Sequence, residues 1–183
     1  MKLLVAALES ELVAFPPEIP GFDRLVTGPG KLRGGVALAR ALEQGTYDEV
    51  VVVGTAGATD DALESAVYEP GSAVQHDVSD LDGVVGQHVS MPQRVTFGSG
   101  DVVIATGDSF VDDEDAVVGI RKLGGGLVDM EAYAYAWVAG EFGIPIRIFK
   151  AVSDRAQDDA LVDWRATVTR CSGELWQRFQ QEY

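Results

Sequence analysis

The sequence predicts a three-layer α/β/α sandwich with a central mixed, largely parallel sheet. Short apolar runs rich in β-branched residues are mostly continuous rather than alternating, which is typical of strands buried on both faces. Helical patterns lie between some of these runs, and such alternation is typical of a sheet covered by helices. With 183 residues, 46% of them apolar, the chain is predicted to form a single domain over residues 1–183.

The strands are expected at apolar segments bounded by polar or glycine-containing stretches. In chain order they are Lys2–Leu8, Arg24–Thr27, Glu49–Val53, Ala73–Val78, Asp101–Ala105, Gly126–Val128 and Ile146–Val152. Residues 79–100 are polar and glycine-rich, which predicts an irregular hairpin or a mobile loop.

Three helices follow from apolar residues at three- and four-residue steps. They are predicted over Leu32–Gln44, over Glu131–Phe142 with Gly143 after its last turn, and from Leu161 to Phe179. The acidic stretch Asp112–Asp115 is interpreted as the start of a further helix, since acidic residues favour a first turn.

Charge and composition exclude several classes of partner. The chain has 29 acidic and 14 basic residues, a formal charge of −15, which argues against binding nucleic acid or an anionic membrane surface. The apolar run Leu3–Leu8 is shorter than a secretory signal, no run approaches the roughly 18 residues of a membrane span, and Cys171 has no disulfide partner. We therefore expect a cytoplasmic protein.

Neither a metal nor a cofactor is predicted. His76, His88 and Cys171 lack zinc-type spacing. The turn Gly28-Pro29-Gly30-Lys31 lacks the spacing of a phosphate loop, and Gly54-Thr55-Ala56-Gly57 is not a dinucleotide fingerprint. Both glycine-rich segments are expected to let the backbone approach a ligand or a neighbouring strand closely.

Two carboxyl groups are expected at one edge of the sheet, where ligands bind to α/β folds. Glu131 follows one predicted strand and Asp154 follows the next, and a right-handed crossover between parallel strands would bring them to the same edge. Two neighbouring carboxyl groups can divide roles, one ionised and one protonated. The alternative stays open that Glu131 only begins a helix and Asp154 only caps the next one.

Taken together, several stretches resemble the purine nucleoside phosphorylase and nucleosidase superfamily, and most of all its 5′-methylthioadenosine/S-adenosylhomocysteine nucleosidases. The matching stretches, in the family's order, are Ala7–Glu11, Thr27–Lys31, Val53–Gly57, His76–Val78, Gly107–Val111, Val128–Ala132 and Val152–Asp154. The resemblance implies the nucleoside phosphorylase-like fold and a purine nucleosidase, an enzyme that hydrolyses the N-glycosidic bond of a 5′-substituted adenosine to free base and a ribose product.

The resemblance also implies three catalytic residues. Glu11 would hold and activate the attacking water. Glu131 would accept hydrogen bonds from the sugar hydroxyls, and Asp154 would protonate the purine. Such residue types suit this bond, because its cleavage builds positive charge on the ribose and negative charge on the departing base.

Substrate-binding roles are implied for a further set of residues. Met130 would form the ribose floor with Glu131, Ser153 would support Asp154, and Phe110 would stack on the base. Val111 would offer the base its backbone groups. The remaining candidates, which would line the pocket beneath sugar and base, are Thr55, Ala56 and Gly57.

Two positions depart from the family pattern. Asp129 stands where the family usually has Glu, and Lys150 stands where nucleosidases often have Arg. The family's members commonly pair, so the resemblance implies a homodimer, and Tyr133, Tyr135 and Trp137 are candidates either for its interface or for the core.

Three alternative functions remain open. They are a futalosine hydrolase, a phosphate-dependent purine nucleoside phosphorylase and a non-catalytic nucleoside-binding module. Hydrolysis is favoured over phosphorolysis because Glu11 would repel phosphate but suits water.

Overall fold

The protein is described here by a computed structural model that covers residues 1–111, 113–156 and 164–183. Its strands are β1 (Lys2–Ala6), β2 (Phe22–Val26), β3 (Glu49–Ala58), β4 (Val67–Tyr68), β5 (Ser72–Gln75), β6 (Arg94–Thr96), β7 (Val103–Thr106), β8 (Leu127–Asp129) and β9 (Ile146–Arg155). Its helices are the 3₁₀ helix η1 (Glu9–Leu12) and the α-helices α1 (Lys31–Gln44), α2 (Glu114–Lys122), α3 (Ala132–Glu141) and α4 (Trp164–Glu182).

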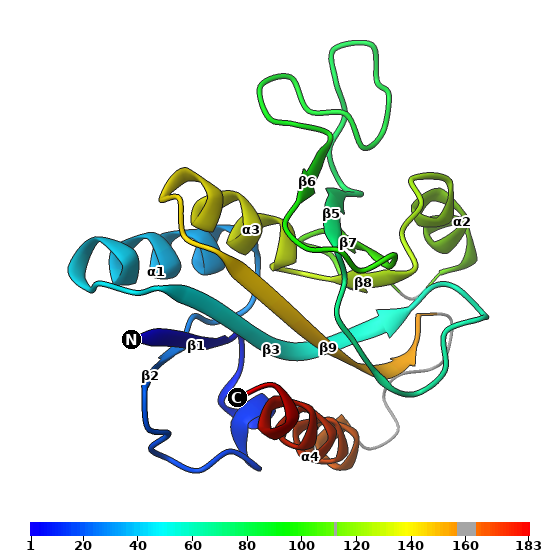
Figure 1. The fold of residues 1–183 in the computed structure, drawn as a ribbon. Coiled ribbons are helices and arrows are strands. Elements are labelled where there is room, and N and C mark those ends of the chain that lie inside the picture. Colours follow the sequence, from blue (N-terminus) through cyan, green and yellow to red (C-terminus); the bar gives the residue numbers. More distant parts are fainter. Residues whose placement is uncertain (112, 157–163) are drawn as a thin grey trace.

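All of these strands join in one mixed sheet whose centre is the long strand β3 (Figure 1). The order is β2-β1-β3-β8-β7-β5-β6, and β9 pairs with the other side of β3 and with β4. Pairing is parallel in β2-β1-β3-β9 and in β5-β7-β8, and antiparallel where β3 meets β8, β5 meets β6 and β9 meets β4. The predicted mixed, largely parallel sheet is confirmed.

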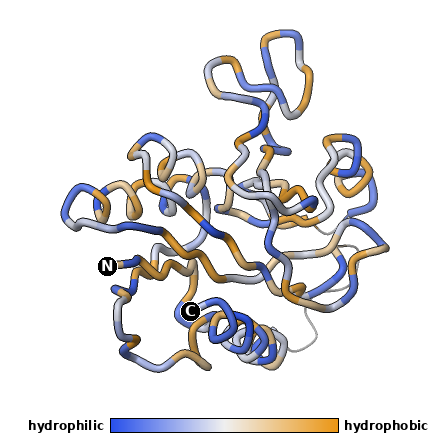
Figure 2. The backbone as a smooth tube through the Cα atoms, viewed as in Figure 1, coloured by the Kyte–Doolittle hydropathy of each residue, from blue (hydrophilic) through white to orange (hydrophobic). Residues whose placement is uncertain are grey.

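Helices cover both faces of this sheet, which gives the three predicted layers. Helices α1 and α3 lie on one face and α4 on the other (Figure 1). Alternate residues of β3 enter the two cores: Val50 and Val52 pack towards α1 and α3, and Val51 and Val53 pack towards α4. The central strands are accordingly mostly hydrophobic along their length (Figure 2). A third cluster joins α2 to β5, β7 and β8.

The main predicted elements are present, with some shifted ends. Asp113 caps α2 by accepting the backbone N–H of Ala116, as expected for an acidic helix start; Asp112 and Leu161 lie outside the described residues. Two short strands, β4 and β6, were not predicted, and β6 forms with β5 the irregular hairpin expected around residues 79–100. Both β3 and β9 run three or more residues beyond their predicted ends.

One topological prediction is wrong. The segment β8-α3-β9 is not a parallel crossover, because β8 runs antiparallel to β3 whereas β9 runs parallel to it. Strand β8 pairs with β3 only at Gly57 and Ala58, beyond the point where β1 ends. The strands that lead to Glu131 and to Asp154 therefore run in opposite directions along β3.

The aromatic residues of α3 belong mainly to the core. Tyr133 and Tyr135 are 1% and 0% exposed, and Trp137 packs against the same cluster. Tyr133 and Tyr135 are therefore core residues, whereas Trp137 is only partly buried. None of the helices in the described part of the chain is both long and apolar enough to cross a membrane.

Packing between α1 and α3 depends on Gly34. A Cβ atom at this position would lie 2.9 Å from Cε1 of Tyr135, whose ring is fully buried and whose hydroxyl lies 2.5 Å from Thr27 Oγ1. We expect Gly34→Ala to lower the free energy of unfolding by about 1–2 kcal/mol, because overpacking outweighs the helix-propensity gain.

The matched control is Gly35→Ala, where the nearest atom to the added Cβ is 3.8 Å away. It should stabilise the protein by about 0.5–1 kcal/mol. Urea unfolding of the two variants measures the difference, and equal midpoints would contradict this account of the interface.

Candidate active site

Glu11 is a buried carboxylate held by four hydrogen bonds. The segment after β1 forms η1, and Glu11 within it is only 3% exposed. Its Oε2 accepts the backbone N–H groups of Ala7 and Leu8 at 3.1 and 3.0 Å. Its Oε1 accepts the backbone N–H and the hydroxyl of Thr55 at 2.8 and 3.0 Å. The carboxylate is thus fixed against β3.

A buried ion pair lies next to Glu11. Lys150 Nζ is 2.8 Å from Asp129 Oδ2, and the two side chains are 3% and 1% exposed. Asp129 also accepts the hydroxyl of Thr106 and the backbone N–H of Ala132. Burial alone would lower the pKa of Lys150, but the charges of Asp129, Glu131 and Glu11 outweigh it and raise the pKa above its ordinary value. The Lys150 side chain is therefore a cation.

Gly54 leaves room for both Glu11 and this cation beside β3. A Cβ atom at Gly54 would stand 3.1 Å from both Glu11 Oε1 and Lys150 Nζ. Any larger residue would push the two groups apart. The sequence predicted a turn here whose backbone approaches a ligand or a neighbouring strand, whereas the segment is part of β3 and the groups close to Gly54 are side chains.

Glu131 is the third carboxyl of the group and immediately precedes α3. Its Oε1 accepts the backbone N–H of Gly30 at 2.7 Å, and its side chain is buried. Burial, reinforced by the charge of Asp129 and opposed by Lys150, raises its pKa to about 7. The interpretation that Glu131 only begins a helix is incomplete, because this carboxyl interacts with charges from three other elements.

Asp154 lies beside Gly57, two residues further along β3 than Thr55. A bulge in β9 makes Val152 pair with Ala56 and Asp154 pair with Gly57, so Ser153 is the extra residue. Such a bulge reverses the face to which the following side chains point. Asp154 Oδ1 consequently comes within 3.2 Å of the Cβ position of Gly57, and the hydroxyl of Ser153 bonds Asp154 Oδ2 at 2.5 Å.

Asp154 does not cap a helix in the described structure. It belongs to β9, which continues to Arg155. The Glu11 carboxylate lies against Gly54 and Thr55, and the Asp154 carboxyl lies against Gly57, so both are adjacent to one stretch of β3.

The remaining candidate residues differ in their exposure. Met130 precedes Glu131 and is half-buried. Phe110 is 58% exposed, beyond β7, and the side chain of Val111 packs with α2 in the third cluster. Of the β3 residues, Ala56 is buried and Thr55 is partly exposed.

Sequence reasoning underestimated Lys150 and Asp129. They were noted only as departures from a family pattern, yet they form an ion pair close to the carboxyl groups of Glu11 and Glu131. The signal was present, since Lys150 interrupts an otherwise apolar strand and a buried lysine requires a partner. No group of three or more His, Cys, Asp and Glu side chains in the described ranges is arranged to hold a metal ion.

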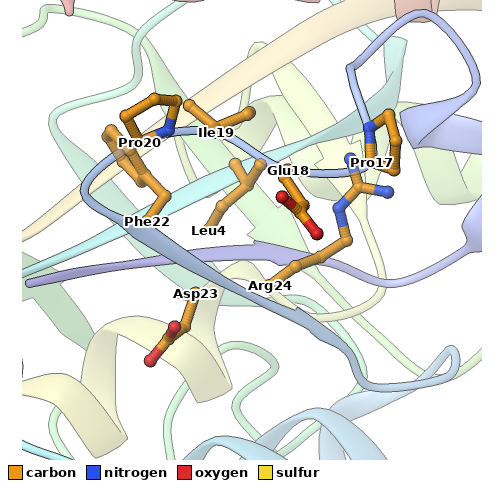
Figure 3. Close-up of a pocket in the computed structure, with 8 residues that line it drawn as sticks. All are labelled: Leu4, Pro17, Glu18, Ile19, Pro20, Phe22, Asp23 and Arg24. Atoms are coloured by element: carbon orange, nitrogen blue, oxygen red, sulfur yellow. The ribbon is translucent and has the colours of Figure 1, made fainter.

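Another feature of the structure is a pocket whose lining includes none of these carboxyl groups (Figure 3). It has a volume of about 470 Å³ and is formed by the edge strand β2 and the loop before it. Its lining residues are Leu4, Pro17, Glu18, Ile19, Pro20, Phe22, Asp23 and Arg24. Because no candidate catalytic residue lines it, this pocket is not where the predicted chemistry would occur.

Comparison with known proteins assigns the chain to a family. The phosphorylase superfamily model matches residues 91–180. Among solved structures, a futalosine hydrolase mutant of Helicobacter pylori has a TM-score of 0.87 at 18% identity over 98% of this chain and 96% of its own. An S-adenosylhomocysteine nucleosidase of Streptococcus pyogenes has a TM-score of 0.84 at 23% identity over 98% and 94%. These two likenesses establish the fold.

A curated relative from Marinomonas sp. (strain MWYL1) goes further. This 5′-methylthioadenosine/S-adenosylhomocysteine nucleosidase is 33% identical over 156 residues, which cover 72% of this chain and 67% of the relative. With the fold, the ordered motifs and this identity in agreement, the chain belongs to the 5′-methylthioadenosine/S-adenosylhomocysteine nucleosidase family of the phosphorylase superfamily.

Proposed function

We propose that this protein hydrolyses the N-glycosidic bond of a 5′-substituted adenosine, either methylthioadenosine or S-adenosylhomocysteine, and releases adenine. As a member of a nucleosidase family, the chain is an N-ribosyl hydrolase. The observation that carries the choice of catalytic groups is the placement of the Glu11 and Asp154 carboxyls along one stretch of β3.

In this proposal Asp154 is the general acid. It gives its proton to the purine as the bond breaks, and the Ser153 hydroxyl holds one of its oxygens. Proton donation to a leaving group contributes about 10²–10⁴-fold to a rate. Glu131 accepts hydrogen bonds from the ribose hydroxyls through the oxygen that Gly30 does not engage, and its charge stabilises the cation that develops on the sugar.

Glu11 holds the attacking water together with Thr55. The two Glu11 oxygens already accept four hydrogen bonds, which fill the acceptor sites of a carboxylate. Three of these donors are backbone N–H groups that cannot leave, whereas the Thr55 hydroxyl can rotate. Water therefore takes the acceptor site that the Thr55 hydroxyl vacates.

Substrate binding is proposed to involve the residues around these three carboxyl groups. Phe110 stacks on the purine, Val111 offers it backbone groups, and Met130 supports the ribose. Beneath sugar and base lie the β3 residues Thr55, Ala56 and Gly57.

Hydrolysis is favoured over phosphorolysis by the state of the nearby cations. Lys150 is neutralised by Asp129, and Lys31 is bound to Asp77. A phosphate ion would have to displace one of these partners and would also approach Glu11 and Glu131. Water meets neither obstacle.

We also propose that the protein is a cytoplasmic homodimer. The segment 79–89 projects from the body beyond β5 and β6 (Figure 1). It exposes several large apolar side chains: Leu81 (90%), Val84 (45%), Val85 (53%) and Val89 (64%). Neighbouring apolar groups exposed in this way favour coverage by a second copy. The single cysteine, Cys171, means that the fold needs no internal disulfide.

The function is tested by a product assay over methylthioadenosine, S-adenosylhomocysteine, adenosine, inosine and futalosine, each with and without phosphate. We expect adenine from the first two substrates at a rate that phosphate does not change. Phosphate-dependent release of base would indicate a phosphorylase, and hypoxanthine from futalosine alone would indicate a futalosine hydrolase. Thermal stabilisation by nucleosides without any product would indicate a binding module.

The control for this assay is Asp154→Asn, which keeps the shape of the side chain and removes its proton. It should bind substrate and turn over at least about a hundredfold more slowly. Single-turnover rates and equilibrium binding separate the two effects. Near-normal turnover would remove Asp154 from the role of acid.

The raised pKa of Glu131 predicts a dependence of stability on pH. Because the folded-state pKa is about 7 and the unfolded value is near 4.3, burying this carboxyl destabilises the protein progressively as pH rises between these values. Glu131→Gln removes the charge and should raise the free energy of unfolding at pH 8, on the order of 3 kcal/mol, and little below pH 4.5.

The matched control is Glu141→Gln, at the exposed end of the same helix. Urea unfolding from pH 4.5 to 8 should show no comparable trend for this variant. A Glu131→Gln protein whose advantage is the same at both ends of the pH range would contradict the assignment of the raised pKa.

Sedimentation velocity tests the proposed dimer. The wild-type protein should sediment as a dimer, and Leu81→Asp should shift it to a monomer, because a buried charge at an apolar interface is strongly unfavourable. Val118→Asp on α2, a residue 41% exposed, serves as the control and should stay dimeric. A monomeric wild type at micromolar concentration would count against this part of the proposal.

A further inference from the structure

Lys31 is the first residue of α1, and its side chain binds residues at the end of β5 and just after it. Its Nζ donates to Gln75 Oε1 at 2.9 Å and to Asp77 Oδ1 at 2.6 Å. The side chains of Lys31 and Asp77 are 17% and 22% exposed, so the ion pair is largely removed from water. None of the roles proposed above involves this lysine.

The contacts of Lys31 form a closed ring with two aspartates. The backbone N–H of Lys31 donates to Asp108 Oδ1 at 2.7 Å. The backbone N–H of Asp108 donates to Asp77 Oδ2 at 2.8 Å, and Asp77 binds the Lys31 ammonium through its other oxygen. Since Lys31 follows β2, Asp77 follows β5 and Asp108 follows β7, the ring ties three separate loops together at one edge of the sheet.

This ring borders the candidate active site on two sides. On one side, Gly30 precedes Lys31 and gives its N–H to Glu131 Oε1. On the other, Phe110 follows Asp108 by two residues. Gly30 has a φ of +98°, and a Cβ there would stand 3.1 Å from Asp108 Oδ1, so glycine is required where the ring meets the turn.

The ammonium is the group that makes the ring stable. Burial would raise the pKa of Asp77, but the hydrogen bonds from Lys31 and from the Asp108 N–H, together with the charge of Lys31, hold it below its ordinary value. Without the ammonium, the ring would hold the two carboxylates of Asp77 and Asp108 in proximity with no opposing charge. The Lys31 cation therefore decides whether these loops stay joined.

We propose that Lys31 is a positioning residue for the bound nucleoside, which through this ring holds the Gly30 N–H against Glu131 and keeps Phe110 in place over the purine. The inference rests on the proposed nucleosidase function. Because Lys31 touches neither the breaking bond nor the attacking water, it acts on binding much more than on the chemical step.

Steady-state kinetics of Lys31→Met tests this inference with methylthioadenosine as substrate. Methionine has an unbranched apolar side chain, one atom shorter than that of lysine, and removes the charge. We expect KM to rise roughly ten- to a hundredfold and kcat to change less than about threefold. Lys31→Arg keeps the charge and should recover most of the lost affinity.

A double substitution identifies the route of the effect. If Lys31 acts through Asp77, then Lys31→Met combined with Asp77→Asn should raise KM no more than Lys31→Met alone, because both remove the same link. The surface control is Lys122→Met at the exposed end of α2, which should leave both constants unchanged.

The outcomes separate this inference from a purely structural role and from the proposed function. A structural role would lower the melting temperature and the active fraction, hence kcat, while KM stayed constant. A KM within twofold of the wild type in Lys31→Met would overturn the inference while the wild type remained an active nucleosidase. A wild-type protein that cleaves no nucleoside in the same assay would instead overturn the proposed function.

Discussion

The buried ion pair between Lys150 and Asp129 is the constraint on which the site depends. Three carboxyl groups, Glu11, Asp129 and Glu131, lie close enough to influence one buried ammonium. Placing like charges together out of water is unfavourable, and Lys150 offsets much of that penalty. Since apolar residues of similar volume often stabilise a fold at least as well as a buried pair, this arrangement is better explained by the chemistry of the site than by stability.

Glycines make this arrangement geometrically possible. At Gly54 the absent side chain leaves room for Glu11 and Lys150, and at Gly57 it leaves room for Asp154. Both lie within β3, where glycine weakens a strand. The strand tolerates them because β9 pairs along the whole of this region and fixes its backbone. At these two positions β3 therefore has no side chain to pack, and the carboxyl groups lie against its backbone.

The sequence predicted the layers and most of the elements, because continuous apolar runs and three- to four-residue periodicity reflect burial directly. Strand direction has no such signature: three residues of β8 read the same whether they run parallel or antiparallel to β3. The bulge at Ser153 was equally invisible, because one extra residue in an extended segment changes no local pattern. Yet the bulge is what places Asp154 opposite Gly57 of β3.

The sequence identified the candidate acids through the order of their motifs along the chain, but it did not predict how these acids interact. Glu131 and Asp154 were expected at one sheet edge through a parallel crossover, which the structure does not contain. Their proximity to the same part of β3 arises instead from two unpredicted features, the antiparallel docking of β8 and the bulge of β9. Long-range pairing depends on the whole sheet, so local sequence could supply the residues and not their geometry.

The balance of charge in the site agrees with the proposed reaction. Carboxyl groups outnumber the ammonium beside them, so the site as a whole is negative around the position proposed for the sugar. Such a field stabilises positive charge developing on the ribose and disfavours an anionic nucleophile. Burial, with the charge of Asp129 added to it, also raises the pKa of Glu131. The electrostatic strain that lowers stability at this edge of the sheet is thus the property that glycosidic bond cleavage requires.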